Sequence, residues 1–306
     1  MTRLKKPKCP VCGDPAEWHK TTREDIPRIY CRKCADYYSH PDAPKILLFD
    51  IETSTIRAAL ARPGDQKVIP DQIEAGFYVT SWAGKWLYQK EVFGATCTPA
   101  EAKKRNDKRI MGELHKVLKR ADFVIHYNGN KFDIKKINWR FLIHNLPPNT
   151  NYGSLDLYKK MKEVFGADSL ALDYVMKELG YNGKHHHDGA QWRDASNGDA
   201  DALKARYEYN LNDVWMLEDL YPRVRGWFKT HHNWGAFFDM YQTAEDRREG
   251  DVRCPRGCRN GIISRHRFTL KYQTPAGYFY EVGTCPVCGC FVRKTQRKPG
   301  QNIMAR

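Results

Sequence analysis

The segment Ile46–Thr53 places the tightest constraint on how this chain can fold. Its apolar first half predicts a buried strand over residues 45–51, and the apolar run ends in two carboxylates one residue apart, Asp50 and Glu52. Because successive side chains of a strand point to opposite faces, these two carboxylates share one face at the strand end. Two adjacent carboxylates are costly unless a cation lies between them, and Mg²⁺ prefers such oxygen ligands. A solvated strand end is the alternative, so further ligands have to come from the rest of the chain.

The central region, residues 45–228, alternates predicted strands and helices. After the first strand, further strands are predicted at residues 77–82, 86–93, 122–126 and 155–157. The first two of these form a hairpin with a turn at Ala83-Gly84-Lys85. Helices are predicted from 99 to about 120, from 132 to about 145, from 169 to 179 and from about 199 to 227. This order predicts an α/β fold in which helices cover the faces of a sheet.

Further acidic side chains follow within this pattern. Asp133 lies near the start of a predicted helix, shortly after the strand at 122–126. Tyr209 and Asp213 are four residues apart on the last predicted helix, so they share one face. Each has a structural alternative: a helix-terminus residue that favours the macrodipole for Asp133, and a packed tyrosine beside a solvated aspartate for the pair. These alternatives explain the residues one at a time, but not their occurrence together.

In this order the residues resemble the three exonuclease motifs of the DEDD superfamily. The motifs are Asp50-Ile51-Glu52-Thr53, Tyr127-Asn128-x3-Phe132-Asp133 and Tyr209-Asn210-x2-Asp213-Val214. A tyrosine four residues before the final aspartate is typical of the DEDDy branch; the DEDDh branch has a histidine five residues before it, where this chain has Glu208. The motifs are most similar to the proofreading 3′→5′ exonuclease domain of family B DNA polymerases. The resemblance covers about residues 45–228 and implies an RNase H-like mixed sheet with flanking helices.

The resemblance also implies a two-metal-ion site for phosphodiester hydrolysis. Asp50, Glu52, Asp133 and Asp213 would hold two Mg²⁺ or Mn²⁺ ions about 4 Å apart, with Asp50 bridging them. Glu52 and Asp213 would complete the site of the attacking water, and Asp133 would serve the second ion. Tyr209 would orient that water by hydrogen bonding, because a phenol is a poor base at neutral pH.

Five side chains are candidates for contact with the substrate strand. Asn128 and Phe132 resemble residues that contact the terminal nucleotide, although a turn former and a core aromatic explain them equally well. Near the C-terminus, basic residues alternate with Phe268 and Tyr272, a pattern that suits phosphate contact and base stacking on a single strand. These basic residues are Arg265, Arg267 and Lys271.

Eight of the ten cysteines form two paired sets. The first set is Cys-x2-Cys, an 18-residue insert and Cys-x2-Cys, and the second is Cys-x3-Cys, a 26-residue insert and Cys-x2-Cys. In a chain with no predicted secretion signal, such pairs indicate structural Zn²⁺ sites rather than disulfides, so we expect a zinc ribbon at each end. Whether His19 or Cys290 joins a site stays open. The predicted ligands are Cys9, Cys12, Cys31 and Cys34 in the first set, and Cys254, Cys258, Cys285 and Cys288 in the second.

The net charge of +15 is concentrated at the two ends. Residues 1–40 carry 9 Lys and Arg against 5 Asp and Glu, and residues 251–306 carry 11 against 2, whereas the middle is close to neutral. Basic end modules favour a polyanion such as nucleic acid, with solubility alone as the simpler explanation. No apolar run approaches the roughly 18 residues of a membrane span, and no signal peptide is predicted. We therefore expect a soluble cytoplasmic protein with no membrane association.

Together these patterns predict a metal-dependent 3′→5′ exonuclease that releases nucleoside monophosphates from single-stranded DNA ends, with two Mg²⁺ or Mn²⁺ ions and two structural Zn²⁺ ions. The expected domains are an N-terminal zinc ribbon (1–40), a DEDDy exonuclease domain (45–228), an aromatic connector (229–250) and a C-terminal zinc ribbon with a basic tail (251–306). The open alternatives are an exoribonuclease, a proofreading subunit acting in trans with a polymerase, and a non-catalytic nucleic-acid-binding scaffold. Single-stranded DNA is the expected partner, and RNA and a replication or repair protein are further candidates.

Overall fold

The structure is a computed structural model that describes most of the central region and parts of both ends. The described residues are 15, 17–19, 28–31, 36–39, 45–62, 64, 67–87, 89–149, 152–181, 189–232, 252–256, 258, 262–273, 278–293 and 298–299. The chain forms two compact units, one spanning Lys45–Leu220 and one that combines Met1–Pro44 with Tyr221–Arg306. Within the described residues, no helix has the length and apolar character needed to cross a membrane.

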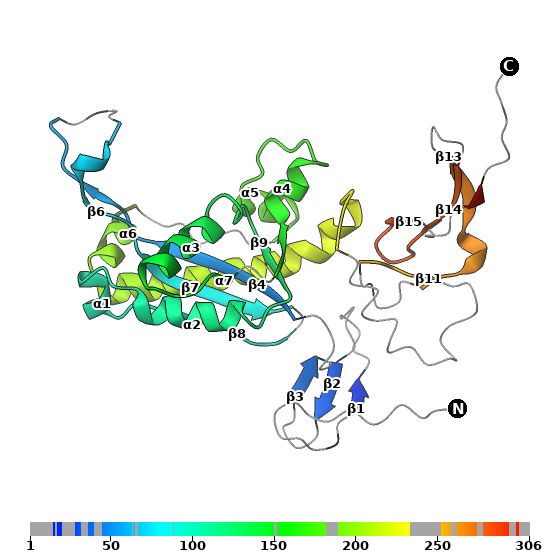
Figure 1. Cartoon of the computed structure of the whole chain (residues 1–306), viewed down its shortest axis with the longest axis horizontal. Coiled ribbons are helices and arrows are strands. Elements are labelled where there is room, and N and C mark those ends of the chain that lie inside the picture. The colour runs from blue at the N-terminus through cyan, green and yellow to red at the C-terminus, as the bar shows by residue number, and fades with distance from the viewer. Residues whose placement is uncertain are drawn as a thin grey trace. The chain divides into compact units, whose positions relative to one another are not determined.

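A five-stranded mixed sheet forms the centre of the Lys45–Leu220 unit (Figure 1). In order across the sheet, its strands are β10 (Gly153–Asp156), β9 (Phe123–His126), β4 (Ile46–Thr53), β7 (Val79–Trp86) and β8 (Val92–Thr96). β4, β9 and β10 are parallel, whereas β7 runs antiparallel to β4 and β8. The mixed α/β sheet predicted from the sequence is therefore confirmed, and the strand that carries Asp50 and Glu52 is its central strand.

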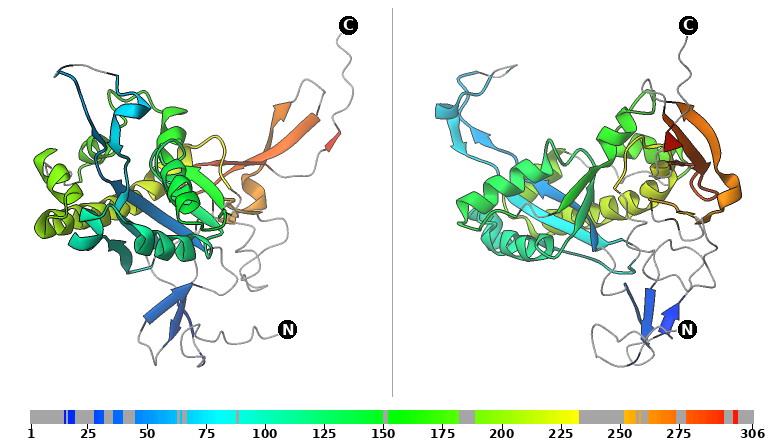
Figure 2. Two further views of the ribbon diagram at one scale, coloured as in Figure 1. Left: turned by 60° about the vertical axis from the view of Figure 1, so that its left-hand side comes forward. Right: turned by 45° about the vertical axis from the view of Figure 1, so that its right-hand side comes forward.

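Helices cover both faces of this sheet (Figures 1 and 2). They are α1 (Pro99–Lys103), α2 (Lys108–Leu118), α3 (Asp133–Ile143), α4 (Leu157–Lys162), α5 (Leu172–Glu178), α6 (Gly189–Ser196) and α7 (Ala200–Val224). A two-stranded arm, β5 (Arg57–Ala58) and β6 (Ile73–Ala75), contains the short helix η1 (Pro70–Gln72) and extends from the sheet. The short helix η2 (Arg225–Trp227) follows α7 directly.

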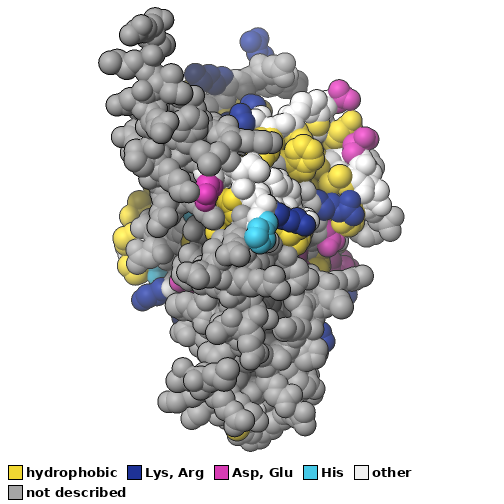
Figure 3. Space-filling model, turned by 90° about the vertical axis from the view of Figure 1, so that its right-hand side faces the viewer, with side chains coloured by type: hydrophobic (Ala, Val, Ile, Leu, Met, Phe, Trp, Pro, Cys, Tyr) yellow, Lys and Arg dark blue, Asp and Glu magenta, His cyan; other side chains and the backbone are white. Residues whose placement is uncertain are grey.

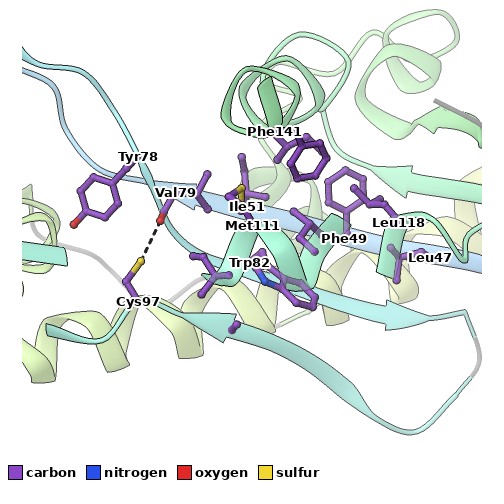
Figure 4. Close-up of a cluster of buried hydrophobic side chains, with 14 of the residues drawn as sticks. Leu47, Phe49, Ile51, Tyr78, Val79, Trp82, Cys97, Met111, Leu118 and Phe141 are labelled. Carbon is purple, nitrogen blue, oxygen red and sulfur yellow. Dashed lines mark hydrogen bonds between the residues drawn. The ribbon is translucent and has the colours of Figure 1, made fainter. Parts of the chain in front are cut away.

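The alternation along β4 separates a hydrophobic face from a polar one. Leu47, Phe49 and Ile51 are buried against side chains of α2 and α3, such as Met111 and Phe141 (Figure 4). The opposite face of β4, with Asp50 and Glu52, contacts α7. One face of the strand thus contributes to the hydrophobic core, while the other holds the carboxylates against a helix.

The predicted turn at Ala83-Gly84-Lys85 is wrong, because these residues lie inside β7. β7 pairs with β4 on one side and β8 on the other, so all three residues belong to a central strand. Gly84 suits this position because a Cβ there would lie 3.3 Å from Leu47 Cδ1. Lys85 is buried because its ammonium group pairs with Glu218 of α7 at 3.2 Å. This long-range partner is what allows a residue typical of turns to lie within a strand.

Other element boundaries also differ from the predictions. β4 continues to Thr53, so Asp50 and Glu52 lie within the strand and not at its end. The helix predicted from 99 to about 120 is two helices, because Asp107 between them turns its carboxylate inward to Arg140 and the Val79 amide. The helix predicted from Ser169 begins only at Leu172. The long helix predicted from about 199 is confirmed as α7, whereas α6 was not predicted.

The other unit contains small sheets from both ends of the chain, each described by itself. The N-terminal segment forms an antiparallel sheet of β1 (Glu17–His19), β2 (Arg28–Cys31) and β3 (Asp36–Ser39). In the C-terminal segment, β11 (Val252–Arg253) pairs with β12 (Ile262–Ile263). β13 (Thr269–Gln273) and β14 (Tyr278–Thr284) pair antiparallel, and β14 also pairs with β15 (Phe291–Arg293) and β16 (Lys298–Pro299). The predicted connector lies outside the described residues from position 233 onward.

Candidate active site

Three carboxylates from two distant parts of the chain meet on the α7 face of the sheet. Asp50 and Glu52 come from β4, and Asp213 comes from α7. One carboxylate oxygen of each lies within 4.8 Å of one from each of the others. Asp213 is buried, and Asp50 and Glu52 are partly buried. Like charges at this spacing repel one another, so the cluster requires compensating positive charge or hydrogen-bond donors.

Asp133 lies next to this cluster at the first position of α3, where its side chain is only 3% exposed. Burial and, to a smaller extent, the carboxylates of Glu52 and Asp156 raise the pKa of Asp133 to about 7. Hydrogen bonds from its own amide and from the Ile51 amide act in the opposite direction, because they favour the charged form. The Ile51 contact places Asp133 beside the segment of β4 that carries Asp50 and Glu52. A nearby cation would offset the cost of ionising this buried group.

Two side chains of α7 that the sequence analysis did not select hold the carboxylates of β4. Asn210 Nδ2 donates to Asp50 Oδ2 at 2.6 Å, while its Oδ1 accepts from Ser81 Oγ at 3.3 Å. Arg206 Nη2 donates to Glu52 Oε2 at 2.7 Å. Positions 206, 210 and 213 follow the i, i+4, i+7 spacing of one helix face. That spacing, counted back from Asp213, is the sequence signal that could have identified both residues.

The loop between β9 and α3 is ordered by side chains from both sides. Asp156 at the end of β10 accepts hydrogen bonds from the amides of Asn128 and Asn130 at 2.9 and 3.2 Å. His126 Nδ1 accepts from the Gly129 amide at 3.1 Å. A Cβ on Gly129 would lie 2.6 Å from the His126 ring and 3.1 Å from Asp133 Oδ2, so only glycine fits here without a shift. These contacts determine where α3 begins and hence where Asp133 lies.

Tyr209, Phe132 and Asn128 are the other predicted side chains of this unit, and each lies in a different setting. Tyr209 is half-buried and lines a cleft between α6 and α7, together with Gln191, Trp192, Ala202 and Arg206. Phe132 is exposed directly before Asp133, and the Lys136 ammonium group lies 4.3 Å from the centre of its ring. Asn128 is half-buried with a positive φ of 60°, which agrees with its role as a turn former.

The donor set on the sheet suits a hard divalent cation. Its potential ligands are carboxylate oxygens alone, which is the preference of Mg²⁺ and Mn²⁺. Asp50, Glu52 and Asp213 could hold one ion, with Asp133 at the edge of the cluster. Arg206 offsets part of the negative charge of the cluster by its own charge, and Asn210 stabilises the Asp50 carboxylate with an N–H donor.

Cysteine thiols form a second potential metal site in the C-terminal segment. The sulfurs of Cys254, Cys285, Cys288 and Cys290 lie within 4.8 Å of one another. Cys254 Sγ is 3.7 Å from Cys288 Sγ and 3.5 Å from Cys290 Sγ. Four thiolates around Zn²⁺, with Zn–S bonds of about 2.3 Å, form a tetrahedron with edges of about 3.8 Å. The spacing of these thiols therefore suits zinc.

Cys258 and Cys290 both lie against the other three thiols of this group. Cys290, which the sequence left open, is one of the four thiols within 4.8 Å of one another. The predicted ligand Cys258 interacts with the same three partners as Cys290, namely Cys254, Cys285 and Cys288. Cys258 Sγ also accepts a hydrogen bond from Arg225 Nη2 at 3.3 Å. Both sulfurs belong to the same small buried cluster.

The remaining predicted residues belong to the two ends of the chain. Cys9, Cys12 and Cys34 lie outside the described residues, and Cys31 is described only as the last residue of β2. Arg265 and Arg267 lie in the short helix η4 (Arg265–Arg267), where Arg267 is exposed, and Lys271 lies on β13. On the face shown in Figure 3, the described Lys and Arg side chains are interspersed with acidic and apolar ones.

Residues 83–225 match the RNase_H_2 family model, described as RNase_H superfamily. The chain carries an RNase H-like domain. The matched range includes Asp133, Tyr209 and Asp213, and begins after β4. The structure is also similar to that of the family B DNA polymerase from the hyperthermophilic archaeon Pyrobaculum calidifontis, with a TM-score of 0.46 and 16% identity over 85% of this chain. The chain spans 40% of the length of that polymerase. No curated protein matches the chain.

Proposed function

We propose that this protein is a metal-dependent 3′→5′ exonuclease that hydrolyses single-stranded DNA ends to nucleoside monophosphates. The observation that carries the proposal is the convergence of Asp50, Glu52 and Asp213 on the face of the RNase H-like sheet, with Asp133 beside them. The DEDDy motif order supports the reaction type, because Tyr209 stands one helical turn before Asp213 and lines the adjoining cleft.

The chain's own residues would perform binding, orientation and charge placement. Asp50, Glu52, Asp133 and Asp213 would hold two Mg²⁺ or Mn²⁺ ions, which when bound lower the pKa of a water molecule and stabilise the leaving 3′-oxygen. Asn210 keeps the Asp50 carboxylate facing the cluster through its 2.6 Å hydrogen bond. Tyr209 would orient the attacking water from the cleft side. Asn128 and Phe132, on the loop that leads into α3, would contact the terminal nucleotide.

The two ends of the chain would bind the substrate nucleic acid, while the carboxylate site binds the phosphodiester that is hydrolysed. In this proposal each end is a zinc ribbon, with one Zn²⁺ held by Cys9, Cys12, Cys31 and Cys34 and another by the C-terminal thiols. The C-terminal thiol spacing supports the second ion. The excess of basic residues at both ends supports contact with a polyanion, and Arg265, Arg267 and Lys271 are the proposed contacts.

The test compares labelled single strands of DNA and RNA of one sequence, each with a free or a blocked 3′ end. With Mg²⁺ present, we expect stepwise release of mononucleotides from the free DNA end and none from the blocked end. The Asp213→Ala variant, purified in the same way, is the control for contaminating nucleases. Internal cleavage, equal decay of blocked strands or full activity in Asp213→Ala would overturn the proposal.

The same assay separates the alternatives. Preferential decay of the RNA strand would identify an exoribonuclease with the same site. Binding of both strands with no metal-dependent cleavage would favour a non-catalytic scaffold. Activity that rises when a DNA polymerase is added would favour proofreading in trans.

A further inference from the structure

Arg206 is a buried cation at the edge of the carboxylate cluster. Its Nη2 donates to Glu52 Oε2 at 2.7 Å and to the Thr53 carbonyl oxygen at 2.8 Å. The residue is only 7% exposed, and the Glu52 side chain is almost as deeply buried. A guanidinium removed from water to this extent requires several acceptors, because its desolvation is costly.

The hydrogen bonds of Arg206 are nevertheless incomplete. Among the described residues, the buried Nε of Arg206 has no hydrogen-bond partner. An unpaired buried donor carries a free-energy cost that a bound acceptor removes. The Arg206 guanidinium can therefore donate a hydrogen bond to one further acceptor.

The same side chain lines the cleft between α6 and α7. Its guanidinium carbon lies 4.6 Å from the centre of the Trp192 ring, and that ring is 43% exposed. Tyr209 and Gln191 line the same cleft. An aromatic surface beside a guanidinium suits a nucleotide, since the ring can contact the base or sugar while the cation binds the phosphate.

We propose that Arg206 binds a phosphate of the strand's terminal nucleotides in this cleft, and that Glu52 holds the guanidinium in place until the strand arrives. The proposal rests on the proposed exonuclease function and adds a substrate-binding residue to it. A guanidinium binds phosphate through two parallel N–H donors, and Nε with Nη2 forms one such pair. When Glu52 shares its charge with a divalent ion, its pairing with Arg206 weakens, and Nη2 becomes available for a phosphate oxygen.

The experiment measures binding without cleavage. A fluorescein-labelled single-stranded oligonucleotide is titrated with the full chain in Ca²⁺, and anisotropy is recorded over a series of KCl concentrations. For Arg206→Gln we expect Kd to rise about tenfold and the slope of log K against log salt to fall by about 0.7, the value for one lost phosphate contact on a single strand. Arg206→Lys keeps the charge but not the paired donors, so we expect it to keep the slope and lose part of the affinity.

A matched arginine provides the control. Arg109 on α2 pairs with Glu101 and Glu113, and Arg109→Gln should leave both Kd and the salt slope unchanged. If Arg206→Gln lowers the melting temperature but keeps the Kd and slope of the native chain, Arg206 has only a structural role and the inference is overturned. If Arg206→Gln does not fold, a change of salt slope in Arg206→Lys overturns the inference, and a reduced affinity at constant slope supports it.

Failure of the proposed function is distinguishable from failure of this inference. If the native chain neither binds nor cleaves single strands, both proposals fall. If the native chain cleaves them and Arg206→Gln binds like Arg109→Gln, the exonuclease proposal stands and only the role of Arg206 is wrong.

Discussion

The carboxylate cluster and the cysteine cluster are both potential metal sites, but they are supported in different ways. The carboxylates lie on a central strand and a long helix, behind which the other face of the sheet contributes to a large hydrophobic core. The buried cluster around the thiols contains six described residues: Cys254, Cys258, Ile263, Cys285, Cys290 and Val292. Since four of these six residues are cysteines, the potential zinc ligands make up most of this small hydrophobic core.

This difference determines what a metal ion would contribute in each place. Apolar burial can order the sheet without an ion, so the carboxylates are pre-positioned and a metal adds reactivity more than stability. At the thiols, little apolar surface is available, and metal binding there is coupled to folding. The comparison predicts that loss of one site abolishes chemistry while loss of the other abolishes structure.

The largest expected effect is on the rate at which the Asp213→Asn variant releases mononucleotides. This change keeps the side-chain shape but removes the negative charge of one potential ligand, and we expect the rate of mononucleotide release to fall by about a thousandfold or more, because a bound metal contributes several kcal/mol to the transition state. The melting temperature should stay the same or rise, since one of three clustered negative charges is removed. Rate assays and thermal melts on one preparation test both statements. A large loss of stability would show that the carboxylate cluster also supports the fold.

The opposite result is expected for Cys285→Ser. We expect this variant to lose the C-terminal zinc and the order of β13–β15, while the Lys45–Leu220 unit keeps its melting transition. Atomic emission measures the zinc content. Limited proteolysis shows separately whether β13–β15 and the Lys45–Leu220 unit remain folded. If proteolysis finds the C-terminal segment equally protected without zinc, the contrast between the two sites is wrong.

Single substitutions at Cys258 and Cys290 test which thiols of the C-terminal cluster bind zinc. If the four gathered thiols are the ligands, Cys290→Ser should lower zinc content and Cys258→Ser should preserve it. The predicted ligand set requires the reverse result. Cobalt substitution checks the assignment, because the thiolate-to-cobalt absorption changes when a serine oxygen replaces a coordinating sulfur.

A smaller effect is expected in the loop that positions Asp133. In Gly129→Ala the new methyl group would overlap the His126 ring, so the loop must shift, with a stability loss of about 1–3 kcal/mol. Because Asp133 lies at the end of this loop, we expect catalysis to fall about tenfold or more. Gly112→Ala on α2 is the matched control: its added Cβ has open space, so a neutral or slightly stabilising result is expected. Equal behaviour of the two variants in urea unfolding would rule out the packing argument.

The smallest expected effect is a pH dependence from His126. Burial lowers the pKa of His126 to about 4, and its neutral form accepts from the Gly129 amide while its Nε2 contacts Ser154 Oγ at 2.8 Å. The unfolded chain binds this proton near pH 6.5 and the folded chain only near pH 4, so stability present above pH 6.5 is lost as the pH falls toward 4. Between pH 7 and 5 the loss is about 2 kcal/mol. Urea unfolding at both pH values should show a smaller difference for His126→Gln, and an unchanged difference would contradict the assignment.

Features that depend on local periodicity could be predicted from the amino-acid sequence. Alternation along a strand put Asp50 and Glu52 on one face, and helical spacing put Tyr209 and Asp213 on another, whatever the rest of the fold. The α/β sheet with helices on its faces followed from the order of apolar runs, and the family resemblance implied that the sheet is mixed; the structure confirms both. These predictions required no knowledge of which distant segments meet.

Tertiary structure decided every feature that depends on a distant partner. Lys85 lies inside a strand because Glu218 neutralises it, and the helix predicted from 99 breaks because the Asp107 carboxylate turns toward Arg140. Arg206 pairs with Glu52 across 154 positions of sequence. No local pattern contains such pairings, because burial of a charge becomes favourable only when packing brings the opposite charge to it. The side chains around the proposed site were therefore decided by packing, whereas the carboxylates themselves could be identified in the sequence.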